Sequence, residues 1–135
     1  MAEMLLYIWI AIFLLGFFIL VTPAFYSKRK ISRMKSKNYQ KKISKIACAR
    51  CSSKEQIINL DIILHNILLD LGYKWTVWEI LKQSPEYIVN INKIWEVHKI
   101  RNNLVHNLDN DYSEKFLRLK LAEFVKEIKI LLKNI

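Results

Sequence analysis

The stretch SSKEQIINLDIILHNILLDLG, residues 52–72, predicts a long apolar helix. Ser52 and Glu55 have the spacing of a capping box, in which the serine oxygen and the glutamate carboxylate each accept a bond from a free backbone amide. Apolar residues fill most of the positions that follow. Gly72 is placed to end the helix in a left-handed conformation. We therefore expect one long helix that ends at Leu71, with Leu64, Leu68 and Leu71 on one face that packs against Ile100 and Leu104.

Two further helices are expected downstream of this stretch. Thr76 and Glu79 form a second capping box, which opens a short helix that stops before Pro85. Asn92 is a suitable cap for a helix that runs to about Leu108. These short connections leave little room for extended segments.

The remaining helices lie at the two ends of the domain. Asp109-Asn110-Asp111 breaks the preceding helix, and Ser113 caps a last amphipathic helix to about Leu132. Lys37 to Ala49 reads as a basic first helix. Since the chain has only two Gly and two Pro, the short loops suit a helical bundle and not a sheet protein with many tight turns.

An apolar run from Met4 to Val21 precedes the domain and contains no charged residue and no Pro. As a helix it would be about 27 Å long, close to the hydrocarbon thickness of a bilayer. Backbone groups in lipid must satisfy one another, so a lone run of this length is expected to be helical. The ends carry aromatic residues that suit a membrane interface: Tyr7, Trp9, Phe25 and Tyr26. A cleaved signal peptide fits less well, because no basic segment precedes the run.

The charge distribution predicts the orientation of this anchor. Residues 24–50 carry ten Lys and Arg and no acid, whereas residues 51–135 carry twelve basic and eleven acidic side chains. The positive-inside rule therefore places the domain in the cytoplasm and the N-terminus outside a cell membrane. The basic residues closest to the anchor are expected to contact anionic lipid headgroups. They are Lys28, Arg29, Lys30, Arg33, Lys35 and Lys37.

The sequence thus divides into three parts. Residues 1–23 form a single transmembrane anchor, residues 24–50 a basic juxtamembrane segment with the first helix, and residues 51–135 a cytoplasmic helical bundle. Cys48 and Cys51 form one Cys-x-x-Cys, without the second pair or the nearby His that a zinc site needs. No metal and no cofactor is indicated.

The helix around residues 93–108 carries the main candidates for chemistry. His98, Asn102 and His106 follow one another at i, i+4 and i+8 on one face, with Trp95 beside them, and Arg101 lies between this face and the apolar stripe. A basic side chain beside imidazoles suits a phosphate and proton transfer near neutral pH. The same residues also suit a purely structural role, with hydrogen bonds to neighbouring loops and a carboxylate for the arginine.

Arg101-Asn102-x-x-x-His106 resembles the Arg-x4-His motif of the HEPN superfamily of helical-bundle proteins. The helical context over about residues 40–135 is compatible with that fold. The anchored arrangement resembles that of small, membrane-anchored, uncharacterised bacterial proteins. In HEPN ribonucleases the Arg and His meet across a homodimer and cleave RNA without metal. The resemblance then implies that His106 is the general acid/base, Arg101 holds the scissile phosphate and Asn102 orients it, with His98 and Trp95 as auxiliary residues.

Many HEPN proteins are not nucleases and use the bundle for binding or dimerisation. Residues 51–135 have a net charge of only +1, and Asp109 and Asp111 follow the motif, which disfavours an RNA backbone. We therefore expect a domain for protein interaction or scaffolding at the membrane, with a homodimer or a protein partner, and we favour this role over an enzymatic one. The alternative is a metal-independent endoribonuclease. A ligand-sensing bundle is a weaker alternative.

Overall fold

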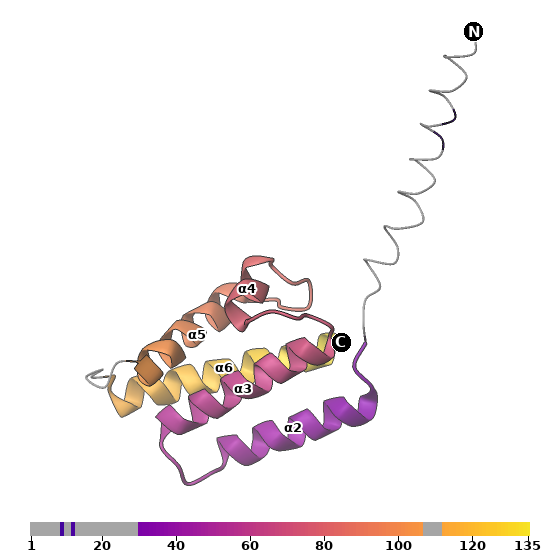
Figure 1. Ribbon diagram of the computed structural model, residues 1–135. Helices are drawn as coiled ribbons and strands as arrows, with labels where there is room; N and C mark the ends of the chain where they lie inside the picture. The colour runs from indigo at the N-terminus through magenta and orange to yellow at the C-terminus, as the bar shows by residue number, and fades with distance from the viewer. Residues whose placement is uncertain (1–8, 10–11, 13–29, 107–111) are drawn as a thin grey trace.

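Five α-helices pack together in the part of the chain that the computed structural model describes, namely residues 9, 12, 30–106 and 112–135. Figure 1 shows their arrangement. They are α2 (Arg33–Ala47), α3 (Ser53–Asp70), α4 (Val77–Lys82), α5 (Ile91–His106) and α6 (Glu114–Asn134). Strands do not occur in these ranges. The all-α bundle expected from the sequence is therefore confirmed.

The N-terminal apolar run lies almost wholly outside the described residues. Only Trp9 and Ile12 of it are described, and both are helical and exposed. Within the described part of the chain, no helix has both the length and the apolar character needed to cross a membrane. The anchor, its orientation and the roles of Lys28 and Arg29 remain predictions.

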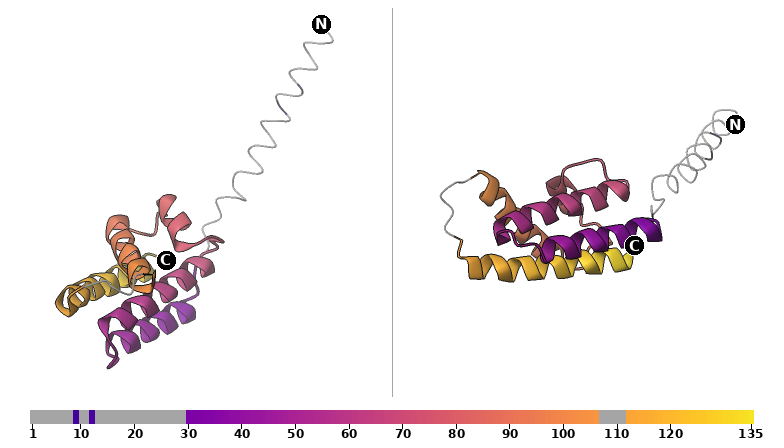
Figure 2. Two further views of the ribbon diagram at one scale, coloured as in Figure 1. Left: turned by 60° about the vertical axis from the view of Figure 1, so that its left-hand side comes forward. Right: turned by 90° about the horizontal axis from the view of Figure 1, so that it is seen from below.

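Helix α3 is the centre of the bundle, because it packs against each of the other four helices. Helix α2 packs on α3 and α6 and has no contact with α4 or α5. Helices α3 and α6 form a central pair: α2 packs against both from one side, and α5 packs against both from the other, with α4 on α3 and α5 (Figures 1 and 2). The C-terminus lies near the start of α2, where the described chain enters the domain.

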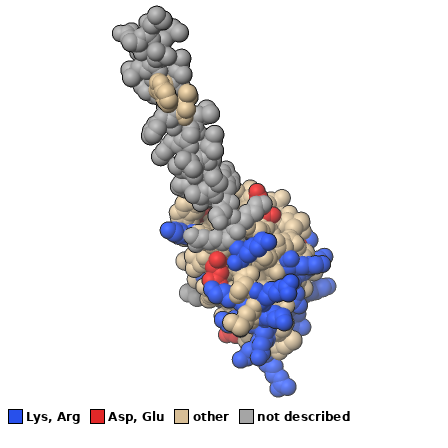
Figure 3. Space-filling view, turned by 90° about the vertical axis from the view of Figure 1, so that its right-hand side faces the viewer, with Lys and Arg blue, Asp and Glu red and all other residues tan. Residues whose placement is uncertain are grey.

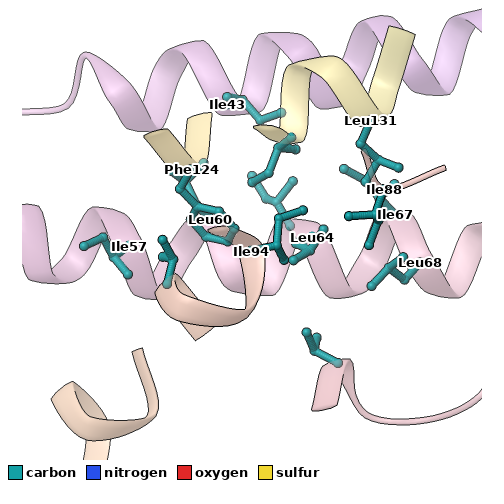
Figure 4. Close-up of a cluster of buried hydrophobic side chains, with 14 of the residues drawn as sticks. Ile43, Ile57, Leu60, Leu64, Ile67, Leu68, Ile88, Ile94, Phe124 and Leu131 are labelled. Carbon is teal, nitrogen blue, oxygen red and sulfur yellow. The ribbon is translucent and has the colours of Figure 1, made fainter. Parts of the chain in front are cut away.

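A single cluster of buried aliphatic side chains holds the helices together (Figure 4). Leu60 and Ile67 of α3 are fully buried, and Ile43, Ile94 and Phe124 reach them from α2, α5 and α6. Burying one such side chain contributes about 1.5–3 kcal/mol. The five residues that we expected to share a core all belong to this cluster: Leu64, Leu68, Leu71, Ile100 and Leu104.

The predicted helix starts are largely confirmed. The Ser52 and Ser113 hydroxyls accept bonds from the backbone amides of Glu55 and Phe116. At Thr76 the complete reciprocal box forms, because the Glu79 carboxylate also accepts the Thr76 amide at 3.0 Å. These side chains satisfy amides that have no partner within the helix.

Helix α3 also ends as predicted. Gly72 has φ 96°, the left-handed conformation that lets the Tyr73 amide turn back to the Leu68 carbonyl, while the Gly72 amide donates to Leu69. The helix itself closes at Asp70, one residue before the expected end.

Two predicted boundaries are wrong. Helix α2 begins at Arg33 and not at Lys37, because Ser32 caps it. Helix α5 begins at Ile91, so Asn92 lies inside its first turn and cannot cap it. The carbonyl of Asn90 accepts the first helical bonds, while the Asn90 side chain binds Glu127. The predicted break at residues 109–111 lies outside the described residues.

Candidate functional site

A buried carboxylate joins α3 to α5 beneath the predicted motif. Asp61 lies on α3 with its side chain only 5% exposed, and it receives two basic residues from α5. His98 Nδ1 is 2.9 Å from Asp61 Oδ1, and Arg101 Nε is 3.3 Å from Asp61 Oδ2. With Asn102 these residues form what we call the α3–α5 polar cluster.

The cluster forms one continuous chain of donors and acceptors. Because a carboxylate only accepts, the bond to Asp61 places the proton of His98 on Nδ1. His98 Nε2 then accepts from Asn102 Nδ2 at 3.3 Å, and Asn102 Oδ1 accepts from Arg101 Nη1 at 2.9 Å. Both ring nitrogens of His98 are therefore engaged, and Arg101 supplies the positive charge opposite Asp61.

Arg101 and Asn102 both reach solvent in part, and 27% of the Arg101 side chain is exposed. Its Nε lies close to Asp61 but has no hydrogen-bond acceptor in suitable geometry among the described residues. The contact with Asp61 is therefore an ion pair, and the hydrogen bond of the guanidinium goes to Asn102. Both interactions hold the guanidinium against its own domain.

The predicted site residues divide into two groups. Arg101, Asn102 and His98 are brought together, as their spacing on one helix allows. His106 ends α5 and is exposed, and among the described residues no hydrogen bond or ion pair links it to Arg101. Trp95 is half-buried and turns toward α4, away from the imidazoles, where its ring stacks on Trp78 at 4.3 Å.

Three Trp side chains from two helices and a loop mark a second surface. Trp75 precedes α4 with 52% of its surface exposed, and Trp78 on α4 is 40% exposed and covers Trp95 on α5. The Trp75 carbonyl lies 3.2 Å from His65 Nε2 of α3, which places this loop beside α3. Ile62 and Leu69 lie within about 60° of His65 on the wheel of α3 and are also exposed. We call Ile62, Leu69, Trp75, Trp78 and Trp95 the tryptophan face.

Lysines border this face. Lys82 Nζ lies 5.0 Å from the Trp78 ring and Lys99 Nζ lies 5.7 Å from the Trp95 ring, both cation–π contacts. The acids Glu79 and Glu96 are bound to Thr76 and Lys120, respectively. Two lysines therefore border the tryptophan face, and Glu79 keeps its negative charge near Lys82.

The juxtamembrane cations differ in their contacts. Lys30, Arg33 and Lys37 are exposed. Lys35 is bound to Asp70 of α3 at 2.9 Å, so it ties α2 to α3. The expectation that these residues meet lipid headgroups stays a prediction, and the structure gives Lys35 a further role within the domain.

Asp70 also accepts a bond from the Tyr39 hydroxyl at 2.9 Å. The Lys35 hydrogen bond is the largest cause that lowers the pKa of Asp70, and the Tyr39 bond adds to it. Burial, together with the Asp70 hydrogen bond and charge, raises the pKa of Tyr39 to about 12. Cys48 and Cys51 are free thiols, and in the described ranges no three His, Cys, Asp or Glu residues are placed to hold a metal.

Asp61, the centre of the α3–α5 polar cluster, was missed by sequence reasoning. A signal exists, since Asp61 is the single charge within the apolar stretch Leu60 to Leu64. A charge at a core position of a helix requires a buried partner. The sequence does not say which of the basic residues is that partner.

Comparison with protein families, with curated proteins and with solved structures finds no match to this chain. The functional argument therefore depends on the residues of the chain itself.

Proposed function

We propose that this protein is a membrane-tethered helical domain that binds another protein at the cytoplasmic face through the tryptophan face. The exposed Trp75 and Trp78 carry this proposal, together with Ile62 and Leu69 beside them. Exposed apolar side chains that gather on one side of a small domain mark interaction sites. Trp is also the residue type most enriched among those that dominate binding energy.

The chemistry of the tryptophan face suggests the kind of partner. An apolar centre with Lys82 and Lys99 at its border suits an amphipathic helix with an apolar stripe and acidic flanks. The lysines would guide the approach, and the apolar side chains would supply most of the affinity.

The membrane tether rests on the sequence. The apolar run Met4–Val21 has the length of a bilayer span, and ten basic residues follow it without an acid. The HEPN-like assignment of the bundle rests on Arg101-Asn102-x-x-x-His106 and on the helical context, and it remains part of this proposal.

The endoribonuclease that the resemblance implies has less support. Its arginine must face the scissile phosphate, whereas the Arg101 guanidinium is bound to Asp61 and Asn102. His106 is exposed and would have to meet an arginine from a second copy. The ligand-sensing bundle stays an untested alternative.

Photo-crosslinking in membranes tests the interaction function. The full-length protein is expressed in the cells that naturally make it, with a crosslinking residue in place of Ile62, and membrane vesicles are prepared from them. The matched control carries the crosslinking residue in place of Lys45 on α2. We expect one discrete product from Ile62 that is lost with Trp75→Ala and competed by a synthetic acidic amphipathic helix. Equal products from Lys45, or competition by a Lys-flanked helix of the same apolar stripe, would contradict the proposal.

Topology is tested on the same vesicles. Protease added to right-side-out vesicles should leave residues 40–135 intact, because the basic segment holds the domain inside. Digestion of the domain from outside would reverse the orientation. A triple variant should insert in both orientations; it carries Lys28→Glu, Arg29→Glu and Lys30→Glu.

Nuclease activity is tested with the purified full-length protein, a mixed RNA pool and excess chelator. We expect no cleavage. If chelator-resistant cleavage occurs and is lost in both Arg101→Ala and His106→Ala while their melting temperatures stay unchanged, the nuclease replaces the interaction function. A general acid/base contributes about 10²–10⁴-fold, so such a loss would be plain.

A further inference from the structure

A second surface of the bundle is strongly basic and lies on the side away from the tryptophan face. Lys37, Lys41 and Lys45 follow one another at i, i+4 and i+8 on α2, so they form one row along the helix. All three are exposed. The row lies on the side of α2 opposite the buried Ile43, so it faces out of the bundle, and α3 and α6 lie between α2 and the helices α4 and α5 that carry Trp78 and Trp95 (Figure 1).

Helix α6 continues the basic surface. Lys126 and Lys129 are exposed on α6, which packs beside α2. Figure 3 shows Lys and Arg side chains crowded on one flank of the bundle, with few acidic atoms among them. We call Lys37, Lys41, Lys45, Lys126 and Lys129 the lysine face.

The acids near the lysine face have partners elsewhere. Residues 30–50 contain no Asp or Glu. On α6, Glu114 binds Ser53 and Arg118, Glu123 binds Lys120, and Glu127 binds Asn90 and Lys93. Among the described residues no salt bridge involves a lysine of the lysine face. The positive charge of the face is therefore uncompensated within the domain.

The form of this surface favours a plane of anionic headgroups over a nucleic acid. The lysines stand on the outer sides of two helices, where long flexible side chains can reach many separate anions. Proteins that bind single-stranded nucleic acid combine a positively charged groove with aromatic side chains on which bases stack. The one aromatic residue of α2, Tyr39, is half-buried and its hydroxyl binds Asp70.

We propose that the lysine face binds the anionic lipid headgroups of the membrane to which the chain is anchored. Helix α2 then lies along the membrane surface, and the tryptophan face is turned toward the cytoplasm and its partner. The inference rests on the proposed tether. The sequence predicted headgroup contacts only for the cations up to Lys37, and the inference adds the lysines further along α2 and those on α6. If the anchor were the only attachment, the helical domain could stand away from the bilayer surface.

Ser44 distinguishes the two orientations. It is exposed on α2 and lies about 16 Å further along the helix than Arg33, so it approaches the lipid only if α2 lies down. The full-length protein is placed in nanodiscs with Cys48→Ser, Cys51→Ser and a fluorophore on Ser44→Cys. The lipids are phosphatidylcholine alone or mixed with phosphatidylserine, and a fraction carries a quencher on the headgroup. Asn66→Cys on the exposed side of α3 is the control position.

We expect the Ser44 probe to be quenched in anionic discs and not in neutral discs, and the Asn66 probe in neither. Each Lys→Ala change on the lysine face should lower the equilibrium constant between the lipid-bound and the detached domain about fivefold. Lys37→Glu, Lys41→Glu and Lys45→Glu together should abolish quenching. The same change of charge at Lys74, Lys82 and Lys99 should leave it intact. High salt should also abolish it, since the screening length falls from about 10 Å at 0.1 M to 3 Å at 1 M.

The outcomes separate this inference from the proposed function. If the chain does not co-purify with neutral discs, the tether itself is wrong. If it enters both kinds of disc and the Ser44 probe is quenched in neither, the tether stands and the lysine face does not bind lipid. An RNA oligonucleotide that removes the quenching in anionic discs at physiological salt, dependent on the same three lysines, would assign the face to RNA and overturn the proposal.

Discussion

Asp61 and Asp70 lie nine residues apart on α3, and each binds a basic side chain from a neighbouring helix. They differ in their exposure. The Asp61 side chain is 5% exposed and lies between α3 and α5. Asp70 ends α3, and its side chain lies beside the first turn of α2 and is 27% exposed. Asp61 contacts His98 and Arg101, which Asn102 joins to each other, whereas Asp70 contacts Lys35 and Tyr39.

The difference teaches that burial, more than the pairing itself, decides how much stability is lost when one partner of an ion pair is removed. Removing one partner from a buried pair leaves a charge that water cannot reach, which costs several kcal/mol. At the surface water replaces the lost partner, so exposed pairs contribute about 0–1 kcal/mol. Four substitutions test this contrast.

The largest effect is expected from Asp61→Ala. It leaves the positive charge of Arg101 and the Nδ1 proton of His98 without an acceptor, and we expect a loss of about 3–5 kcal/mol in the free energy of unfolding. Urea unfolding of the full-length protein in detergent measures it. Asp61→Asn retains an acceptor for His98 and should cost less. A change below 1 kcal/mol in Asp61→Ala would show that water reaches this carboxylate.

Arg101→Ala should cost about 1–3 kcal/mol, because Asp61 keeps its bond to His98 but loses the opposite charge, and Asn102 loses a donor. His106→Ala is the matched control on the same helix. Since His106 is exposed, its removal should change stability by less than about 0.5 kcal/mol. Thermal melts of both variants measure the two effects. Equal shifts in melting temperature would contradict the conclusion that Arg101 belongs to the α3–α5 polar cluster and His106 does not.

Tyr39→Phe should lower stability at neutral pH by about 1 kcal/mol through the lost bond to Asp70. The pKa of Tyr39 is raised to about 12 in the folded state, above its unfolded value of about 10. This contribution to stability is therefore present below about pH 10 and is lost as the pH rises toward 12. Unfolding curves from pH 8 to about 12 should show a smaller alkaline loss in Tyr39→Phe than in the natural protein.

Lys35→Ala should have the smallest effect, about 0–1 kcal/mol, because the pair with Asp70 is largely exposed. Lys35 lowers the pKa of Asp70. The stability from that shift is present above the unfolded pKa of about 3.9 and is lost as the pH falls through the lower folded pKa. An NMR titration of the Asp70 carboxyl should show its pKa rising in Lys35→Ala. An unchanged pKa would assign the shift to Tyr39.

Local sequence predicted the parts of the fold that local chemistry controls. Ser52, Thr76 and Ser113 cap helices because a side-chain oxygen reaches an amide two or three residues along the same chain. The error at Asn92 has a different origin. Asn92 is a residue type that suits a cap, but the Asn90 carbonyl accepts the first helical bonds, and the Asn90 side chain binds Glu127 of α6, 37 residues along the chain.

The candidate site could be predicted only in part. The spacing of His98, Arg101 and Asn102 on one helix placed them together. Whether they face a substrate or an internal carboxylate depends on which residue of α3 lies opposite.

The sequence by itself determined the helices, their caps, the apolar faces and the distribution of charge, because each follows from residues within a few positions of one another. Only the tertiary structure decided that Arg101 and His98 share Asp61, that Lys35 is held by Asp70, and that α3 and α6 separate α2 from α4 and α5. The physical reason is that a helix wheel fixes which side chains point the same way, whereas the packing of whole helices fixes what they meet.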